Sequence, residues 1–180
     1  MVATKTFMSD EELMLLPDDG SKYEFMEGGL KMSPTGLRHE IIGAKLIYKL
    51  YEFVEMDEIG YVCGSSAGYR MKSGNALSPD VSFVRKSRLK NGESLEGFGN
   101  FAPDLAVEIL SPSEKRSEIT GKIKEYFENG SELVWIIDPK KRTATVYHSY
   151  DSYSILKENE SLSGENVIPG FSCYLAGLLK

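Results

Sequence analysis

The sequence has few cysteines and no long apolar run. Cys63 and Cys173 stand alone, without the Cys-x-x-Cys or Cys/His spacing of a zinc site, and this predicts two free thiols in a reducing compartment. No apolar stretch approaches the roughly 20 residues that a membrane-spanning helix needs. The N-terminus also lacks the basic region and long apolar stretch of a secretory signal. These absences predict a cytoplasmic protein without a membrane partner.

Positive charge is in short supply as well. Lysine and arginine number 21 against 27 aspartates and glutamates, a formal net charge of -6, which argues against a protein held to nucleic acid by bulk charge. Any nucleic-acid contact therefore needs a local basic patch. The 180 residues, 41% of them hydrophobic, are enough for one domain with a full core, and we expect a single domain over residues 1–180.

Hydrophobic periodicity predicts alternating helices and strands around one core, an α/β or α+β fold. Capping-box spacing between Ser9 and Glu12 predicts a short N-terminal helix. The expected helices then cover 37–56 and 117–129, and a hairpin pairs residues 23–26 with 30–33. Further strands are expected at 61–64, 67–71, 80–84, 104–110, 133–138, 143–148 and 153–158.

The strand expected at 104–110 contains an acid among apolar neighbours. Side chains alternate faces along a strand, so Asp104 and Glu108 share a face with Ala106, while the opposite face is fully apolar. Asp104 and Glu108 lie roughly 13 Å apart along the strand, too far to hold one ion together. An ionised Glu108 needs a cation, either a lysine or arginine or a metal ion. Asp80, which opens the neighbouring strand, is the natural second carboxylate for a metal site.

Several segments together resemble one known family. They are LSPDVSFV, PDLAVEILSPS and GKIKEYFENGSELVWIIDP, preceded by YEFMEGGLKMSPTGLRH and followed by PGF at 169–171. In this order they resemble the Uma-two family of prokaryotic endonucleases, over nearly the whole chain. The resemblance implies a restriction-endonuclease-like fold: a mixed β-sheet flanked by helices, with an added N-terminal hairpin and C-terminal antiparallel strands.

The resemblance also implies a set of catalytic residues. Asp80 and Glu108 match the two acids that hold Mg²⁺ or Mn²⁺ in such nucleases. The general pattern places a lysine two residues after the second acid, but this sequence has Leu110 there. The family places its lysine on the following helix, which implies Lys122. Helical geometry favours Lys122 over Lys124, because Lys122 lies at the border of that helix's apolar face.

Two further residues match the family, with structural alternatives. Glu24 matches its Tyr-Glu signature and is a candidate metal ligand, directly or through water, or a polar residue of a half-exposed hairpin. His39 matches a histidine at the start of the long helix, where it would orient water or phosphate or be a satisfied structural histidine. Trp135 and Tyr126 are interpreted as core residues.

A basic segment at 85–90 follows the Asp80 strand. Its cations, which make it a candidate for contacting nucleic acid or simply a solvated loop, are Arg85, Lys86, Arg88 and Lys90. A second basic turn lies at 140–142.

The leading hypothesis is a metal-dependent DNA endonuclease that acts as a homodimer, by analogy with enzymes that cut two strands. One alternative is a non-cleaving nucleic-acid-binding or regulatory domain on the same fold. Another is a nuclease that acts on RNA or structured DNA.

Overall fold

A six-stranded mixed sheet forms the centre of the computed structural model, which describes residues 7–17, 22–33, 36–89, 96–112 and 114–180. Across the sheet the strands are β10 (Ser152–Lys157), β9 (Thr143–Ser149), β8 (Leu133–Asp138), β7 (Leu105–Ile109), β6 (Val81–Arg85) and β3 (Gly60–Gly64). Only β7 and β8 are parallel among these pairs, and α3 (Arg116–Glu128) connects them, because a parallel pair needs a crossover.

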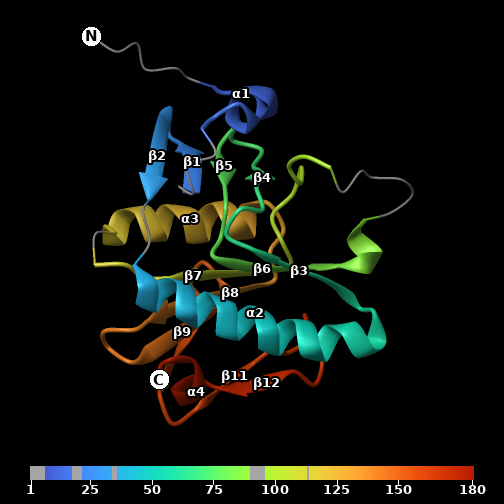
Figure 1. Cartoon of the computed structure of the whole chain (residues 1–180), viewed down its shortest axis with the longest axis vertical. Helices are drawn as coiled ribbons and strands as arrows, with labels where there is room; N and C mark the ends of the chain where they lie inside the picture. The colour runs from blue at the N-terminus through green and yellow to red at the C-terminus, as the bar shows by residue number, and fades with distance from the viewer. Residues whose placement is uncertain (1–6, 18–21, 34–35, 90–95, 113) are drawn as a thin grey trace.

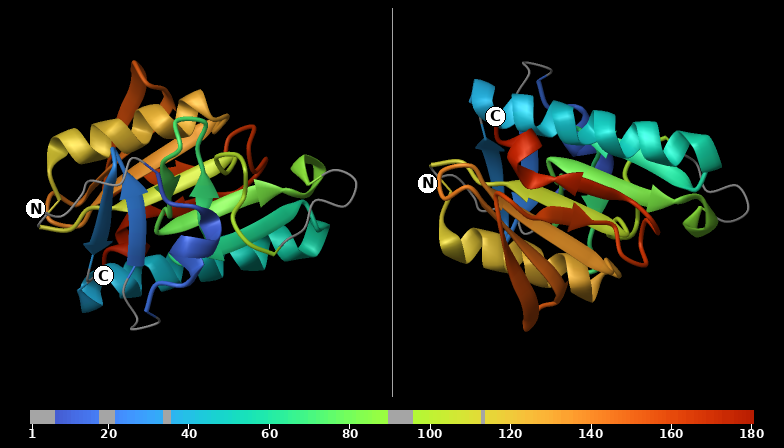
Figure 2. Two further views of the ribbon diagram at one scale, coloured as in Figure 1. Left: turned by 90° about the horizontal axis from the view of Figure 1, so that it is seen from above. Right: turned by 90° about the horizontal axis from the view of Figure 1, so that it is seen from below.

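Two helices cover the two faces of this sheet, as the view from above shows (Figure 2). α2 (Leu37–Asp57) packs its buried Leu46 and Leu50 against one face, which includes the apolar side of β7. α3 packs Ile119 and Ile123 against the other face, which includes Ala106. Glu108, two residues along from Ala106, therefore points toward α3. The alternation predicted for this strand is confirmed.

A second, smaller sheet lies beside α3 (Figure 1). Its order is β2 (Gly29–Ser33), β1 (Lys22–Met26), β5 (Ala76–Leu77) and β4 (Tyr69–Arg70). Glu27 and Gly28 join β1 to β2 with positive φ angles of 52° and 78°, the backbone of a type I′ turn. α1 (Asp10–Met14), capped by Ser9 and Glu12, packs Leu13 against this sheet. β1 belongs to this small sheet, and its Glu24 is buried.

The C-terminal part adds β11 (Ser161–Ser163), β12 (Ser172–Tyr174) and α4 (Leu175–Leu178). Their buried side chains, Leu162, Leu175 and Leu178 among them, join the core under α2. A single 3₁₀ turn, η1 (Lys86–Arg88), follows β6.

The structure matches the expected mixed sheet, flanking helices, N-terminal hairpin and C-terminal antiparallel strands. The sequence did not reveal β5, β11, β12 or α4, because each is four residues or shorter and carries too little periodicity. Among the described residues, no helix combines the length and the apolar character that crossing a membrane requires.

Candidate active site

Asp80 and Glu108 meet on neighbouring strands. β6 and β7 are antiparallel with Val81 opposite Val107, so Asp80, just before β6, lies opposite Glu108 near the end of β7. The carboxylate of Asp80 reaches across the strands: its Oδ2 accepts a hydrogen bond from the backbone N of Ile109 at 2.7 Å. Asp80 is 6% exposed and Glu108 is 1% exposed. The two acids are therefore buried neighbours on adjacent strands.

Lys122 enters the same place from α3. Its Nζ lies 3.1 Å from Glu108 Oε2 and 2.8 Å from Glu24 Oε2, with 2% of the residue exposed. Lys124, by contrast, is 60% exposed and faces Glu128 on the outer side of the helix. The preference for Lys122 follows from the helix face that packs on the sheet.

Glu24 lies in the same buried cluster and is not half-exposed. It is 3% exposed, and besides Lys122 its Oε1 accepts a hydrogen bond from the backbone N of Ser78 at 3.0 Å. β1 thus supplies a third buried carboxylate. Because it holds one side of the Lys122 ammonium while Glu108 holds another, Glu24 fixes where that ammonium points.

His39 stands at the start of α2 and contacts Asp80. Its Nε2 lies 3.0 Å from Asp80 Oδ2, and its Nδ1 lies 3.4 Å from Glu40 Oε1. Burial lowers the pKa of His39, but the hydrogen bond and charge of Asp80 outweigh it and raise that pKa above its ordinary value. His39 is thus a buried acid–base group on the edge of the cluster.

Two members of the cluster escaped the sequence analysis. Lys22 Nζ donates to Asp80 Oδ1 at 2.8 Å, and the hydroxyl of Tyr126 donates to Glu108 Oε1 at 2.5 Å. A signal was present for both: Lys22 shares a strand face with Glu24 two residues later, and Tyr126 lies one helical turn after Lys122. Trp135 is a fully buried core residue, as interpreted, but Tyr126 is both core and site.

The cluster contains three carboxyl groups and two ammonium groups. Burial raises the pKa of Glu108 to about 7, although Lys122 and Lys22 oppose this. Burial also lowers the pKa of Lys122, but attraction by Glu108 and Glu24 overcomes it and holds the pKa above the ordinary lysine range. For Asp80, burial raises the pKa, and His39 and Lys22 reverse the shift to well below the ordinary value. Of Glu108 and Asp80, Glu108 is therefore the one that protonates first as the pH falls.

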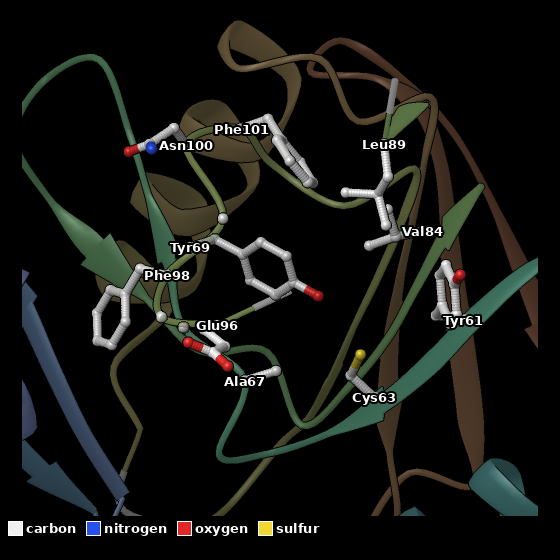
Figure 3. A pocket seen from close by; sticks show the side chains of 13 residues that line it. Tyr61, Cys63, Ala67, Tyr69, Val84, Leu89, Glu96, Phe98, Asn100 and Phe101 are labelled. Carbon is white, nitrogen blue, oxygen red and sulfur yellow. The ribbon is translucent and has the colours of Figure 1, made fainter. Parts of the chain in front are cut away.

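A hollow of about 310 Å³ gives access to this cluster. His39 and Asp80 line it together with Gly43 of α2 and residues 64–67 after β3. A separate pocket of about 330 Å³ is lined by Cys63 and Ala67, and Tyr69 and Phe101 project into it (Figure 3). None of the seven side chains described above lines the aromatic pocket, so the hollow at Asp80 is the pocket that reaches the cluster.

The predicted basic segment has intramolecular partners. Arg85 Nη1 donates to Oδ1 of buried Asp104 at 3.3 Å, and its Nη2 donates to Glu132 Oε2 at 3.0 Å. Lys86 Nζ lies 2.7 Å from Glu58 Oε2. Arg88 donates to the carbonyl oxygens of residues 102 and 130. Much of this charge is therefore occupied in the fold, and Asp104 is a structural partner of Arg85. Lys90 lies outside the described residues.

The carboxylate oxygens of Asp80 and Glu108 are the type of ligand that a hard divalent cation such as Mg²⁺ prefers. Mg²⁺ typically uses one or two carboxylates and completes its shell with water and substrate phosphate, and Asp80 and Glu108 supply that number. Within the described stretches, no three His, Cys, Asp or Glu side chains converge on a common metal position. An ion bound by these two acids would also have to displace the Lys22 ammonium from Asp80.

Comparisons with known proteins found one matching family and a similar solved structure. The family described as "Uma2: Putative restriction endonuclease" matches residues 10–176. A solved structure described as a "putative nuclease belonging to DUF820" from Anabaena variabilis has a TM-score of 0.83 and 20% identity, over 96% of this chain and 97% of that chain. At that identity the likeness shows a shared fold. The curated proteins gave no match. Because the family match spans most of the sequence, this chain belongs to the Uma2 family.

Proposed function

We propose that the protein is a nuclease that hydrolyses phosphodiester bonds in DNA with the help of Mg²⁺ or Mn²⁺. The observation that carries this proposal is the burial of Asp80, Glu108 and Lys122, from two strands and a helix, in one cluster that a hollow reaches at Asp80. Family membership and the nuclease-like fold support the same class of reaction.

Asp80 and Glu108 would hold the metal, which, when bound, polarises the phosphate and lowers the pKa of water. Lys122 keeps its proton and would donate hydrogen bonds to a phosphate oxygen as negative charge develops there. Glu24 positions Lys122 for this contact. His39, at the entrance, would hold a proton beside Asp80 and orient water or phosphate.

The test is plasmid nicking with Mg²⁺ or Mn²⁺, comparing the wild type with Asp80→Asn, Lys122→Met and Lys124→Met. Loss of one such electrostatic group lowers the rate about 10²- to 10³-fold in other enzymes, and we expect this for the first two variants. Lys124→Met is the matched control, because it removes an exposed lysine from the same helix. Full activity in Asp80→Asn or Lys122→Met would refute the assignment.

The ion pair between Lys22 and Asp80 favours one alternative, a nucleic-acid-binding or regulatory domain that does not cleave. Cations already balance the acids in this arrangement, without a metal. Binding of oligonucleotides without metal-dependent cleavage of DNA or RNA would support that alternative. Cleavage of RNA or branched DNA in preference to duplex DNA would instead change the substrate within the same mechanism.

Cutting both strands of a duplex requires two active sites, and we propose a homodimer on this ground. Sedimentation of the intact protein tests it: a monomer at the concentrations at which it makes double-strand breaks would contradict the proposal.

A further inference from the structure

A large groove lies just outside the active site, where two parallel strands end. It has a volume of about 970 Å³ and is lined by the segments that leave β7 and β8, at 110–112 and 138–141, and by the start of α2 at 36–39. Figure 1 shows the start of α2 and the chain leaving β7 on the same side of the molecule. In open α/β sheets, ligands bind outside the carboxyl ends of parallel strands. The groove has the corresponding position at the one parallel pair of this sheet, β7 and β8.

The charges of the groove are mainly positive. Arg38, Lys140 and Lys141 line it, against the single carboxylate of Asp138. These three cations are exposed. The excess of two positive charges contrasts with the formal net charge of -6 for the whole chain. Such a local excess attracts an anionic ligand despite the acidic background.

Backbone and side-chain contacts hold these cations in place. Arg38 Nη2 donates to the carbonyl oxygen of Pro139 at 3.1 Å, which ties the start of α2 to the turn after β8. The backbone N atoms of Lys140 and Lys141 donate to Asp138 Oδ1 at 3.0 and 2.9 Å. Lys141 Nζ lies 3.2 Å from Asp138 Oδ2. The turn is thus shaped before a ligand arrives, which lowers the ordering cost of binding.

The start of α2 adds to the positive potential. Gly36 is its N-cap, and no side chain caps the helix. The first amide groups of a long helix carry partial positive charge and accept anions when no cap occupies them. This feature supports the three cations but would not define a site without them.

The groove adjoins the hollow at Asp80. His39 lines both of them. A polyanion lying in the groove would therefore contact His39 beside Asp80.

We propose that this groove binds the backbone phosphates of the nucleic-acid strand being cut, directly beside the scissile phosphate. The inference rests on the proposed function and assigns substrate binding chiefly to Arg38, Lys140 and Lys141, which are exposed. Arg85 and Arg88 are assigned to the scaffold, because their side chains are only 26% and 25% exposed and lie against Asp104. Arg142, the third cation of the basic turn, pairs with Glu158 and donates to Leu179 O. In this proposal Lys140 and Lys141 contact the substrate, while Arg142 stabilises the fold.

Binding of a fluorescent duplex oligonucleotide, measured by anisotropy in EDTA over a range of salt, separates this proposal from catalysis. Each lost phosphate contact reduces the slope of log K against log salt by about 0.9. We expect the triple variant Arg38→Gln/Lys140→Gln/Lys141→Gln to lose roughly two to three units of slope and to bind about 10- to 100-fold more weakly at low salt. Lys124→Gln, with its own nearby acid, should behave as the wild type.

Asp138→Asn is a variant that we expect to change the oligonucleotide affinity in the opposite direction. The amide oxygen can still accept from the turn, while the one carboxylate among the described residues that line the groove is removed, so we expect severalfold tighter binding. Misfolding would not produce that result.

The outcomes separate the two proposals. A wild type that binds and a triple variant with an unchanged slope would overturn the groove alone. A wild type that binds neither DNA nor RNA at low salt would overturn the proposed function, and the groove with it. Weaker binding in the triple variant, together with tighter binding in Asp138→Asn, would establish the groove.

Discussion

Lys22 places its ammonium 2.8 Å from Oδ1 of Asp80, the carboxylate expected to hold a metal ion. Burial lowers the pKa of Lys22, but the charges of Glu108 and Asp80 overcome this and raise that pKa. The lysine thus already provides a positive charge beside both acids. A divalent ion must compete with it.

We therefore expect Lys22→Met to bind Mn²⁺ more tightly than the wild type, because a competing positive charge is gone. Without metal, the same variant should be less stable, since breaking a buried ion pair costs about 3–5 kcal/mol. Calorimetric titration with Mn²⁺ and urea unfolding in EDTA check the two effects. Unchanged or weaker Mn²⁺ affinity in a folded variant would show that Lys22 does not compete.

Tyr126→Phe should destabilise the fold through Glu108. The hydroxyl is the partner of Glu108 Oε1, and loss of a hydrogen bond to a buried charged group costs about 1.5–3 kcal/mol. Urea unfolding at pH 8 measures this change. Tyr51→Phe is the matched control, because Tyr51 also donates to a glutamate at 2.7 Å, but on the exposed face of α2. Equal effects of the two substitutions would contradict a special role for the buried bond.

The pKa of Glu108, raised from 4.5 to about 7, predicts a dependence of stability on pH. Between these values the native state binds more protons at this site than the unfolded state, so the contribution of Glu108 to stability falls as the pH rises through this window. A shift of this size corresponds to about 3 kcal/mol. Unfolding of the wild type and Glu108→Gln at pH 5 and pH 8 isolates the effect. We expect the free energy of unfolding of Glu108→Gln to rise relative to that of the wild type between pH 5 and pH 8. The same difference in unfolding free energy at both pH values would refute the raised pKa of Glu108.

Arg85→Gln should weaken the fold more than it weakens nucleic-acid binding. The guanidinium of Arg85 contacts buried Asp104 and Glu132, and the substitution removes these contacts. The backbone N of Arg85 also donates to Asp104, and that hydrogen bond remains. We expect a loss of about 1–3 kcal/mol in unfolding free energy and little change in the salt dependence of DNA binding. A reduced salt slope with unchanged stability would instead assign Arg85 to the substrate.

The sequence determined those parts of the site that depend on local periodicity. Alternation along a strand separates Glu108 from the apolar face of β7, and the 3.6-residue period sets Lys122 at the edge of the buried face of α3. Both periods are properties of a few consecutive residues. The place of Asp80 at the start of the neighbouring strand indicated a second acid, and the family resemblance implied the same residue.

Only the tertiary structure decided the rest. Lys22 and Glu24 reach the cluster because the small sheet packs beside α3. The residues of the hairpin do not themselves specify where that sheet packs. The same holds for Arg38 and Lys140, which meet in one groove because α2 begins where β8 ends. Contacts between residues far apart in the chain depend on how whole elements pack. The pattern within each element therefore gives the face of a side chain but not its partner across the fold.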